Sequence, residues 1–173
     1  MTGSPLPDRI ETARLTLRCF REEDVERFVP LIGDWEVARW LARVPHPYGL
    51  EDGRWWVAVT ARNRARRATL DLLAVRGADG QPVGGIGLNL DDGEVGYWLG
   101  RSHQGIGYGT EMLRAMQRVA FEDLHLSRLW AAIAPDNDRS RRVLEKTGFV
   151  TTTPVQYELT AERWRTMPQE SAR

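Results

Sequence analysis

The chain has 173 residues, which is long enough for one domain with a full hydrophobic core and short for two. Apolar residues make up 42% and charged residues 28%, and the formal net charge is zero, so no global field attracts nucleic acid or an anionic membrane. The single cysteine, Cys19, excludes an internal disulfide and argues against a zinc site.

Two features of the chain set the expected compartment. The N-terminal segment lacks a long apolar core and carries two prolines, unlike a secretory signal. No stretch approaches the roughly 20 apolar residues that span a bilayer. We therefore expect a cytoplasmic protein that uses no metal and binds neither nucleic acid nor membrane. We expect one domain over 1–173, with its core at about 10–160, a lead-in at 1–9 and a tail at 161–173.

The hydrophobic pattern alternates between strand and helix periods along the chain. In chain order it predicts a strand at 14–18, helices at 22–33, 35–42 and 50–66, strands at 69–75, 82–90 and 94–99, a helix at 110–124, a strand at 129–133, a helix at 138–147 and a strand at 155–159. Tight turns at 78–80 and 91–93 indicate that the three middle strands form an antiparallel meander. This order predicts an α/β fold with mixed strand direction.

The segment 103–113, with the sequence HQGIGYGTEML, runs from a glycine loop straight into a helical pattern. The first turn of a helix has unpaired N–H groups and a positive dipole end, which together attract an anion. Gly105, Gly107 and Gly109 would let a phosphate approach the backbone, because no Cβ stands in the way. The loop is therefore predicted to hold a pyrophosphate on the N–H groups of residues 105–110.

Other glycine motifs fit this loop poorly. A P-loop has Lys and then Ser or Thr after its last glycine, whereas Thr110 is followed by Glu111. The dinucleotide motif reads G-x-G-x-x-G and follows a parallel strand, whereas this loop reads G-x-G-x-G and follows a predicted meander. From these residues alone, a plain glycine-rich turn without a ligand is the alternative.

The loop also resembles part of a known family. Gln104-x-x-Gly107-x-Gly109 is similar to the (Q/R)-x-x-G-x-(G/A) pyrophosphate loop of the GCN5-related N-acetyltransferases (GNAT), which bind acetyl-CoA. Residues 11–18 resemble the opening strand of the RimJ/RimL branch, whose type members acetylate the N-termini of ribosomal proteins. The segments 84–99 and 137–149 resemble the third and fourth strands and the second half of the family. The resemblance covers residues 10 to about 160.

The resemblance implies a mixed, mostly antiparallel central sheet flanked by helices, with the family's strands four and five splayed apart. It implies a single GNAT domain and acetyl-CoA as cosubstrate, whose pantetheine arm lies between those strands. The expected reaction is direct attack of a primary amine on the acetyl thioester in a ternary complex. The acceptor is a protein N-terminus or a small-molecule amine, and the resemblance allows a homodimer. A non-catalytic acyl-CoA-binding or sensing domain is the alternative.

The resemblance also assigns candidate residues for the chemistry. Glu94 is the candidate general base on the fourth strand, although an acid there can also be a polar residue next to a turn. Ser140 is the candidate acid for the CoA thiolate, with water as the alternative, because Leu144 stands where many members have tyrosine. Asn137 either bonds the pantetheine or caps the following helix. The expected coenzyme-binding residues are Trp98, Leu99, Gln104, Gly105, Ile106, Gly107, Tyr108, Gly109, Thr110, Asn137 and Ser140.

One residue of the loop departs from the family pattern. Ile106 stands where many members carry Lys or Arg to pair with phosphate charge. The missing cation should weaken binding only modestly, because an exposed ion pair is typically worth less than about 1 kcal/mol.

Overall fold

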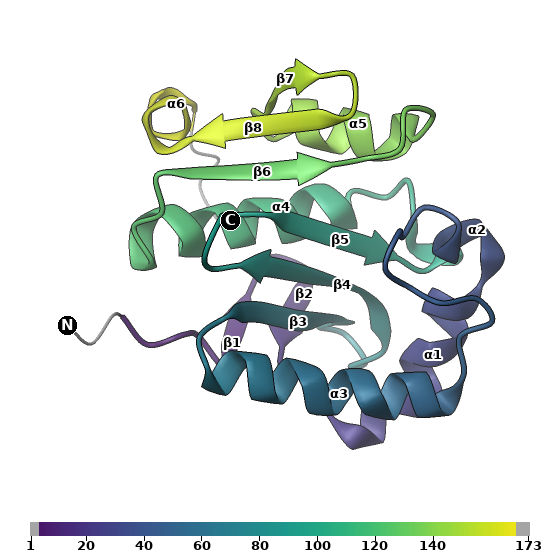
Figure 1. The fold of residues 1–173 in the computed structure, drawn as a ribbon. Helices are drawn as coiled ribbons and strands as arrows, with labels where there is room; N and C mark the ends of the chain where they lie inside the picture. Colours follow the sequence, from purple (N-terminus) through teal and green to yellow (C-terminus); the bar gives the residue numbers. More distant parts are fainter. Residues whose placement is uncertain (1–3, 169–173) are drawn as a thin grey trace.

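The computed structural model describes residues 4–168 and contains two antiparallel sheets (Figure 1). The larger sheet has the strand order β1-β2-β3-β4-β5, and the smaller sheet has the order β6-β8-β7. The strands are β1 (Arg9–Glu11), β2 (Leu15–Arg18), β3 (Thr69–Arg76), β4 (Pro82–Asn89), β5 (Val95–Leu99), β6 (Arg128–Ala132), β7 (Val150–Thr153) and β8 (Gln156–Thr160). The α-helices are α1 (Val25–Gly33), α2 (Trp35–Ala38), α3 (Leu50–Ala65), α4 (Tyr108–Arg118), α5 (Asp138–Lys146) and α6 (Ala161–Thr166).

The three middle strands form the predicted meander. The turn between β3 and β4 contains Gly80 and the turn between β4 and β5 contains Gly93, both with positive φ. Glycine adopts this backbone without the clash that a Cβ would cause. In the resulting register Asp71 pairs with Gly87, and Gly87 pairs with Gly96. Residues directly opposite each other point to the same face of a sheet, so these three positions share one face.

The strands β5 and β6 meet at one point and then belong to different sheets. A parallel bridge joins Glu94 to Trp130, and the Trp130 N–H donates to the Gly93 carbonyl at 3.0 Å. Beyond this bridge β5 pairs only with β4 within the described part of the chain. The predicted fold class is confirmed, including the splay between the family's fourth and fifth strands, which are β5 and β6.

The hydrophobic core lies on both faces of the larger sheet. Leu72 and Ile86 pack with Met112 of α4 on one face. Leu73 packs with Phe28 of α1 on the other face, which α1 and α3 cover (Figure 1). Alternate residues of β3 therefore serve two cores, as expected for a strand that is buried on both sides.

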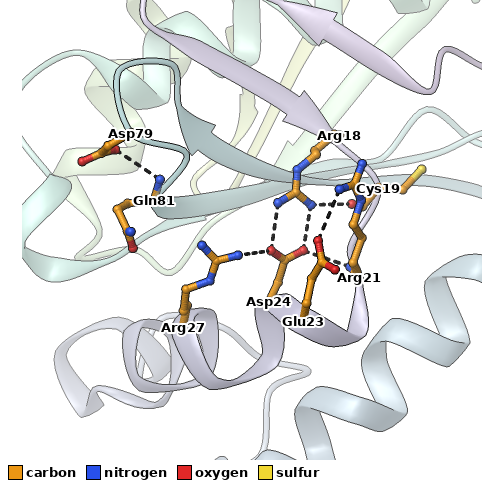
Figure 2. Close-up of polar contacts among 8 residues, drawn as sticks. All are labelled: Arg18, Cys19, Arg21, Glu23, Asp24, Arg27, Asp79 and Gln81. Carbon is orange, nitrogen blue, oxygen red and sulfur yellow. Dashed lines mark hydrogen bonds and ion pairs between the residues drawn. The ribbon is translucent and has the colours of Figure 1, made fainter.

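A buried ion pair fixes the start of α1 against β2 (Figure 2). The two guanidinium nitrogens of Arg18 donate to the carboxylate oxygens of Asp24 at 2.7 and 2.8 Å, and Arg27 adds a third bond at 2.9 Å. The Asp24 side chain is fully buried. Burial alone would raise the pKa of Asp24, but the hydrogen bonds and charges of its arginine partners hold that pKa below its usual value.

Several predicted elements differ from the structure. The helix predicted at 35–42 ends at Ala38, and the helix predicted at 110–124 passes into a π-helical segment at Val119–Asp123. The strand β1 begins at the last residue of the expected lead-in, and the expected tail contains α6. The strand β7 was not predicted, because all its residues are exposed and it has no alternation of apolar and polar side chains. Within residues 4–168 no helix is both long enough and apolar enough to cross a membrane.

Candidate active site

The glycine loop presents unpaired backbone donors at the start of α4. Gly105 and Gly107 have φ values of 79° and 93°, and Gly107 is the N-cap of the helix. No N–H group of residues 105–107 donates a hydrogen bond within the described residues. A Cβ on Gly105 would meet open space. Free N–H groups, an open approach and a helix N-terminus together fit a diphosphate.

A cluster of polar contacts from the start of β2 holds this loop. We call it the Arg14 clamp, and it consists of Thr12, Arg14 and Glu111. The Arg14 guanidinium donates from Nη1 to the Ile106 carbonyl and from Nε to Glu111, both at 2.8 Å. The Arg14 backbone N–H and the Thr12 hydroxyl also donate to Glu111, at 2.7 and 2.6 Å. These hydrogen bonds outweigh the effect of burial and hold the pKa of Glu111 below its usual value.

The clamp also determines which way the loop's donors point. In a planar trans peptide the C=O and the following N–H point in opposite directions. Because the Ile106 carbonyl points toward Arg14, the Gly107 N–H points away from it, toward the open side of the loop. The clamp was not predicted from the sequence, since its members lie 97 residues apart along the chain.

The loop, the end of β5 and the start of α5 lie together. Gln104 donates from Nε2 to the Leu99 carbonyl at 3.0 Å, and its Oε1 accepts a hydrogen bond from Arg139 of α5. Gln104 therefore braces the loop from its side-chain amide. Thr110 lies on the first turn of α4. Its side-chain hydroxyl has no hydrogen-bond partner among residues 4–168 and is not fully sealed from solvent. This hydroxyl can add to the donors of the loop.

The predicted thiolate acid and its neighbour Asn137 also lie at the start of α5. The Asn137 Oδ1 accepts a hydrogen bond from the Ser140 N–H at 3.1 Å, so Asn137 is the N-cap of α5. The Ser140 carbonyl accepts a hydrogen bond from the Tyr97 hydroxyl at 3.3 Å. Burial raises the pKa of Tyr97 to about 12, so this hydroxyl is protonated at neutral pH. Sequence reasoning missed Tyr97, although its alternation with Trp98 on β5 directs it to the α4 side.

Glu94 lies on the opposite face of β5, at the bridge to β6. Both carboxylate oxygens accept from Nη2 of Arg43, at 3.0 and 3.2 Å. The Glu94 side chain is 22% exposed and that of Arg43 is 83% exposed, so solvent weakens this pair. Trp98 lies on the same face, with its indole Nε1 over Gly85. The structure therefore groups Ser140 with the loop and places Glu94 on the opposite face of β5, at the bridge between the two sheets.

Comparisons with known proteins identify the family of the chain. The sequence pattern described as "Acetyltransferase (GNAT) domain" matches residues 14–150. The chain belongs to the GNAT acetyltransferase family. The GNAT resemblance seen in the sequence motifs is thereby confirmed, and the protein is an N-acetyltransferase by family.

One relative is similar to the chain in sequence, and two solved structures are similar to it in fold. The chain is 32% identical over 146 residues to "Putative ribosomal N-acetyltransferase YdaF" of Bacillus subtilis, which covers 79% of this chain and 78% of that protein. The structure of Mycobacterium smegmatis RimJ in complex with CoA-disulfide has a TM-score of 0.82 at 20% identity, and covers 99% of this chain and 94% of that one. The microcin C7 self-immunity acetyltransferase MccE, in complex with acetyl-CoA and AMP, has a TM-score of 0.75 at 18% identity. The match covers 91% of this chain and 98% of that one.

Proposed function

We propose that this GNAT protein transfers the acetyl group of acetyl-CoA to a primary amine by direct attack in a ternary complex. The observation that carries the proposal is the preset glycine loop, whose free N–H groups lie beside the gap between β5 and β6. A loop of this kind suits the diphosphate of coenzyme A, and an unpaired strand edge suits an extended arm that adds to it. RimJ and MccE were solved with CoA or acetyl-CoA bound, which supports the same ligand here.

The proposed coenzyme site follows the path from loop to strand. The diphosphate lies on the N–H groups of residues 105–110, with the Thr110 hydroxyl as an additional donor. The pantetheine arm runs along β5 past Leu99 and Trp98. Asn137 acts by capping α5, which holds Ser140 at the loop end of the gap. Ile106 adds no charge, and its exposed side chain faces solvent beside the loop.

The proposed chemistry uses groups that lie near the two faces of β5. Glu94 accepts a proton from the attacking ammonium or amine, and the exposed Arg43 must leave it or share it when the acceptor binds. Ser140 donates a proton to the departing CoA thiolate. Backbone N–H groups near Leu99 stabilise the negative charge that develops on the acetyl oxygen. The name of the relative YdaF favours a protein N-terminus as acceptor, and a small-molecule amine uses the same chemistry.

The test is CoA thiol release from acetyl-CoA with a panel of N-terminal peptides and small amines. The expected result is turnover with at least one class, which is lost in Glu94→Gln while the Kd for acetyl-CoA is unchanged. Acetyl-CoA binding without turnover across the panel would favour the sensing domain. Absence of acetyl-CoA binding would refute the proposal.

A further inference from the structure

The face of the larger sheet that carries Glu94 has a regular layout. Its cross-strand rows are Thr69, Asn89 and Glu94; Asp71, Gly87 and Gly96; and Leu73, Gly85 and Trp98. The first row is polar and the third is apolar. The middle row has a side chain only at Asp71, so Gly87 and Gly96 place no side chain between the polar row and the apolar row; we call this glycine strip the trough.

The floor of this trough is open on the β5 side. Gly96 is exposed, and a Cβ placed on it would have no atom within 4 Å. On the β4 side, a Cβ on Gly87 would lie 2.4 Å from Oδ1 of Asp71. The Asp71 carboxylate therefore leans over β4 toward Gly96 and occupies the space that a side chain on Gly87 would fill.

One oxygen of Asp71 is available to a ligand. Oδ2 accepts a hydrogen bond from the Thr69 hydroxyl, whereas Oδ1 has no hydrogen-bond partner among residues 4–168. Among the side-chain nitrogens and oxygens of that part of the chain, the one that is both sealed from solvent and unpartnered is Nη1 of Arg64. Oδ1 of Asp71 is therefore unpartnered but not fully sealed from solvent. Burial raises the pKa of Asp71, and the Thr69 bond opposes this only in part, so a cationic partner would stabilise the carboxylate.

Sheet geometry sets the distance from this carboxylate to Glu94. Neighbouring strands lie roughly 4.8 Å apart, and two residues along a strand span roughly 7 Å. The Asp71 carboxylate lies over Gly87 and is thus one strand spacing from Gly96. The diagonal from Gly87 to the position of Glu94 is roughly 8 Å. The guanidinium of Arg43 already sits on Glu94, which shows that the polar edge of the trough accepts a cation.

The two acids have different partners in the proposed reaction. Glu94 accepts the proton that the reacting amine loses. Asp71 has no part in that proton transfer, so it suits a cationic group that keeps its charge, which a neighbouring carboxylate stabilises.

We propose that Asp71 binds a second, non-reacting ammonium group of the acceptor, which makes diamines and other primary amines with a second positive charge roughly 8 Å away the preferred substrates. This inference rests on the proposed acetyltransferase function. It names Asp71 as the residue that selects the acceptor, by a direct contact with substrate.

The experiment compares linear diamines of increasing chain length with monoamines of the same length. The wild type should prefer the diamine. In Asp71→Asn the KM for the diamine should rise at least about tenfold, as expected for loss of a hydrogen bond to a charged group, while the KM values for the monoamine and acetyl-CoA change by less than about twofold. Asp91→Asn, an exposed acid in the neighbouring turn, is the matched control and should leave both KM values unchanged.

The inference would be overturned by equal increases in KM for the monoamine and the diamine in Asp71→Asn. It would also be overturned if the wild type showed no preference for the diamine. If Asp71→Asn does not fold, Gly96→Val fills the open floor and should raise the diamine KM at unchanged thermal stability. If no amine is acetylated, calorimetric titration of 1,5-diaminopentane into the protein with acetyl-CoA decides separately. Binding that is lost in Asp71→Asn supports the ammonium site even though the transfer function fails, and absence of binding overturns the inference about Asp71.

Discussion

The Arg14 clamp makes a quantitative prediction for coenzyme affinity. Replacing Arg14 with Ala removes the donor that holds the Ile106 carbonyl and one of the hydrogen-bond donors to Glu111. The Ile106–Gly107 peptide is then free to rotate, which turns the Gly107 N–H away from the proposed diphosphate site. A hydrogen bond to a charged group is worth about 1.5–3 kcal/mol, and the 46% exposure of the Arg14 side chain reduces this.

We therefore expect Arg14→Ala to cost about 1–2 kcal/mol of acetyl-CoA binding, which is a rise in Kd of roughly 5- to 30-fold. Isothermal titration measures this Kd, and kcat at saturating acetyl-CoA should change little, because the clamp touches no reacting atom. Arg14→Lys keeps one donor and should recover part of the affinity. An unchanged Kd in Arg14→Ala, or a loss confined to kcat, would refute the role given to the clamp.

Three further substitutions test the fold and the proton transfer. Asp24→Asn should destabilise the protein by about 3–5 kcal/mol in urea unfolding, because it leaves Arg18 facing a neutral group in a buried site; a loss below about 1 kcal/mol would contradict this. The pKa of Asp24 is lower in the folded state than its unfolded value of about 3.9, so its contribution to stability is present above about pH 3.9 and is lost as the pH falls through the folded pKa. The free energy of unfolding of Asp24→Asn should therefore depend less on pH in this acidic range. Ser140→Ala should lower kcat roughly 100-fold while Tyr97→Phe changes it less than about threefold, since the tyrosine hydroxyl donates to the Ser140 carbonyl. The reverse order in single-turnover rates would assign the proton transfer to Tyr97.

The parts of the fold that the sequence predicted are those with strong local patterns. The meander was predictable because turn glycines at Gly80 and Gly93 separate runs with strand periodicity. The glycine loop was predictable because Gly105 and Gly107 need positive φ at a helix start. Both signals depend on residues that are neighbours in the chain.

The parts that sequence reasoning missed depend on contacts between distant segments. Arg14 and Glu111 meet only when β2 lies beside α4, so no spacing in the sequence links them. Asp71 looked like an ordinary strand residue, and its free oxygen follows from the register that places Gly87 beneath it. The proposed roles of Glu94 and Ser140 stay predictions, because only a measured reaction can assign them.

The single bridge between the two sheets has a consequence for the order of events in the catalytic cycle. Glu94 and Trp130 form the point at which the sheets diverge, so the proposed base lies where the gap closes. A coenzyme arm in the gap would end beside this base and form one wall of the site for the amine. This favours an ordered sequence in which the coenzyme enters before the amine, and in which the empty enzyme is protected from binding an acceptor that it cannot yet acetylate.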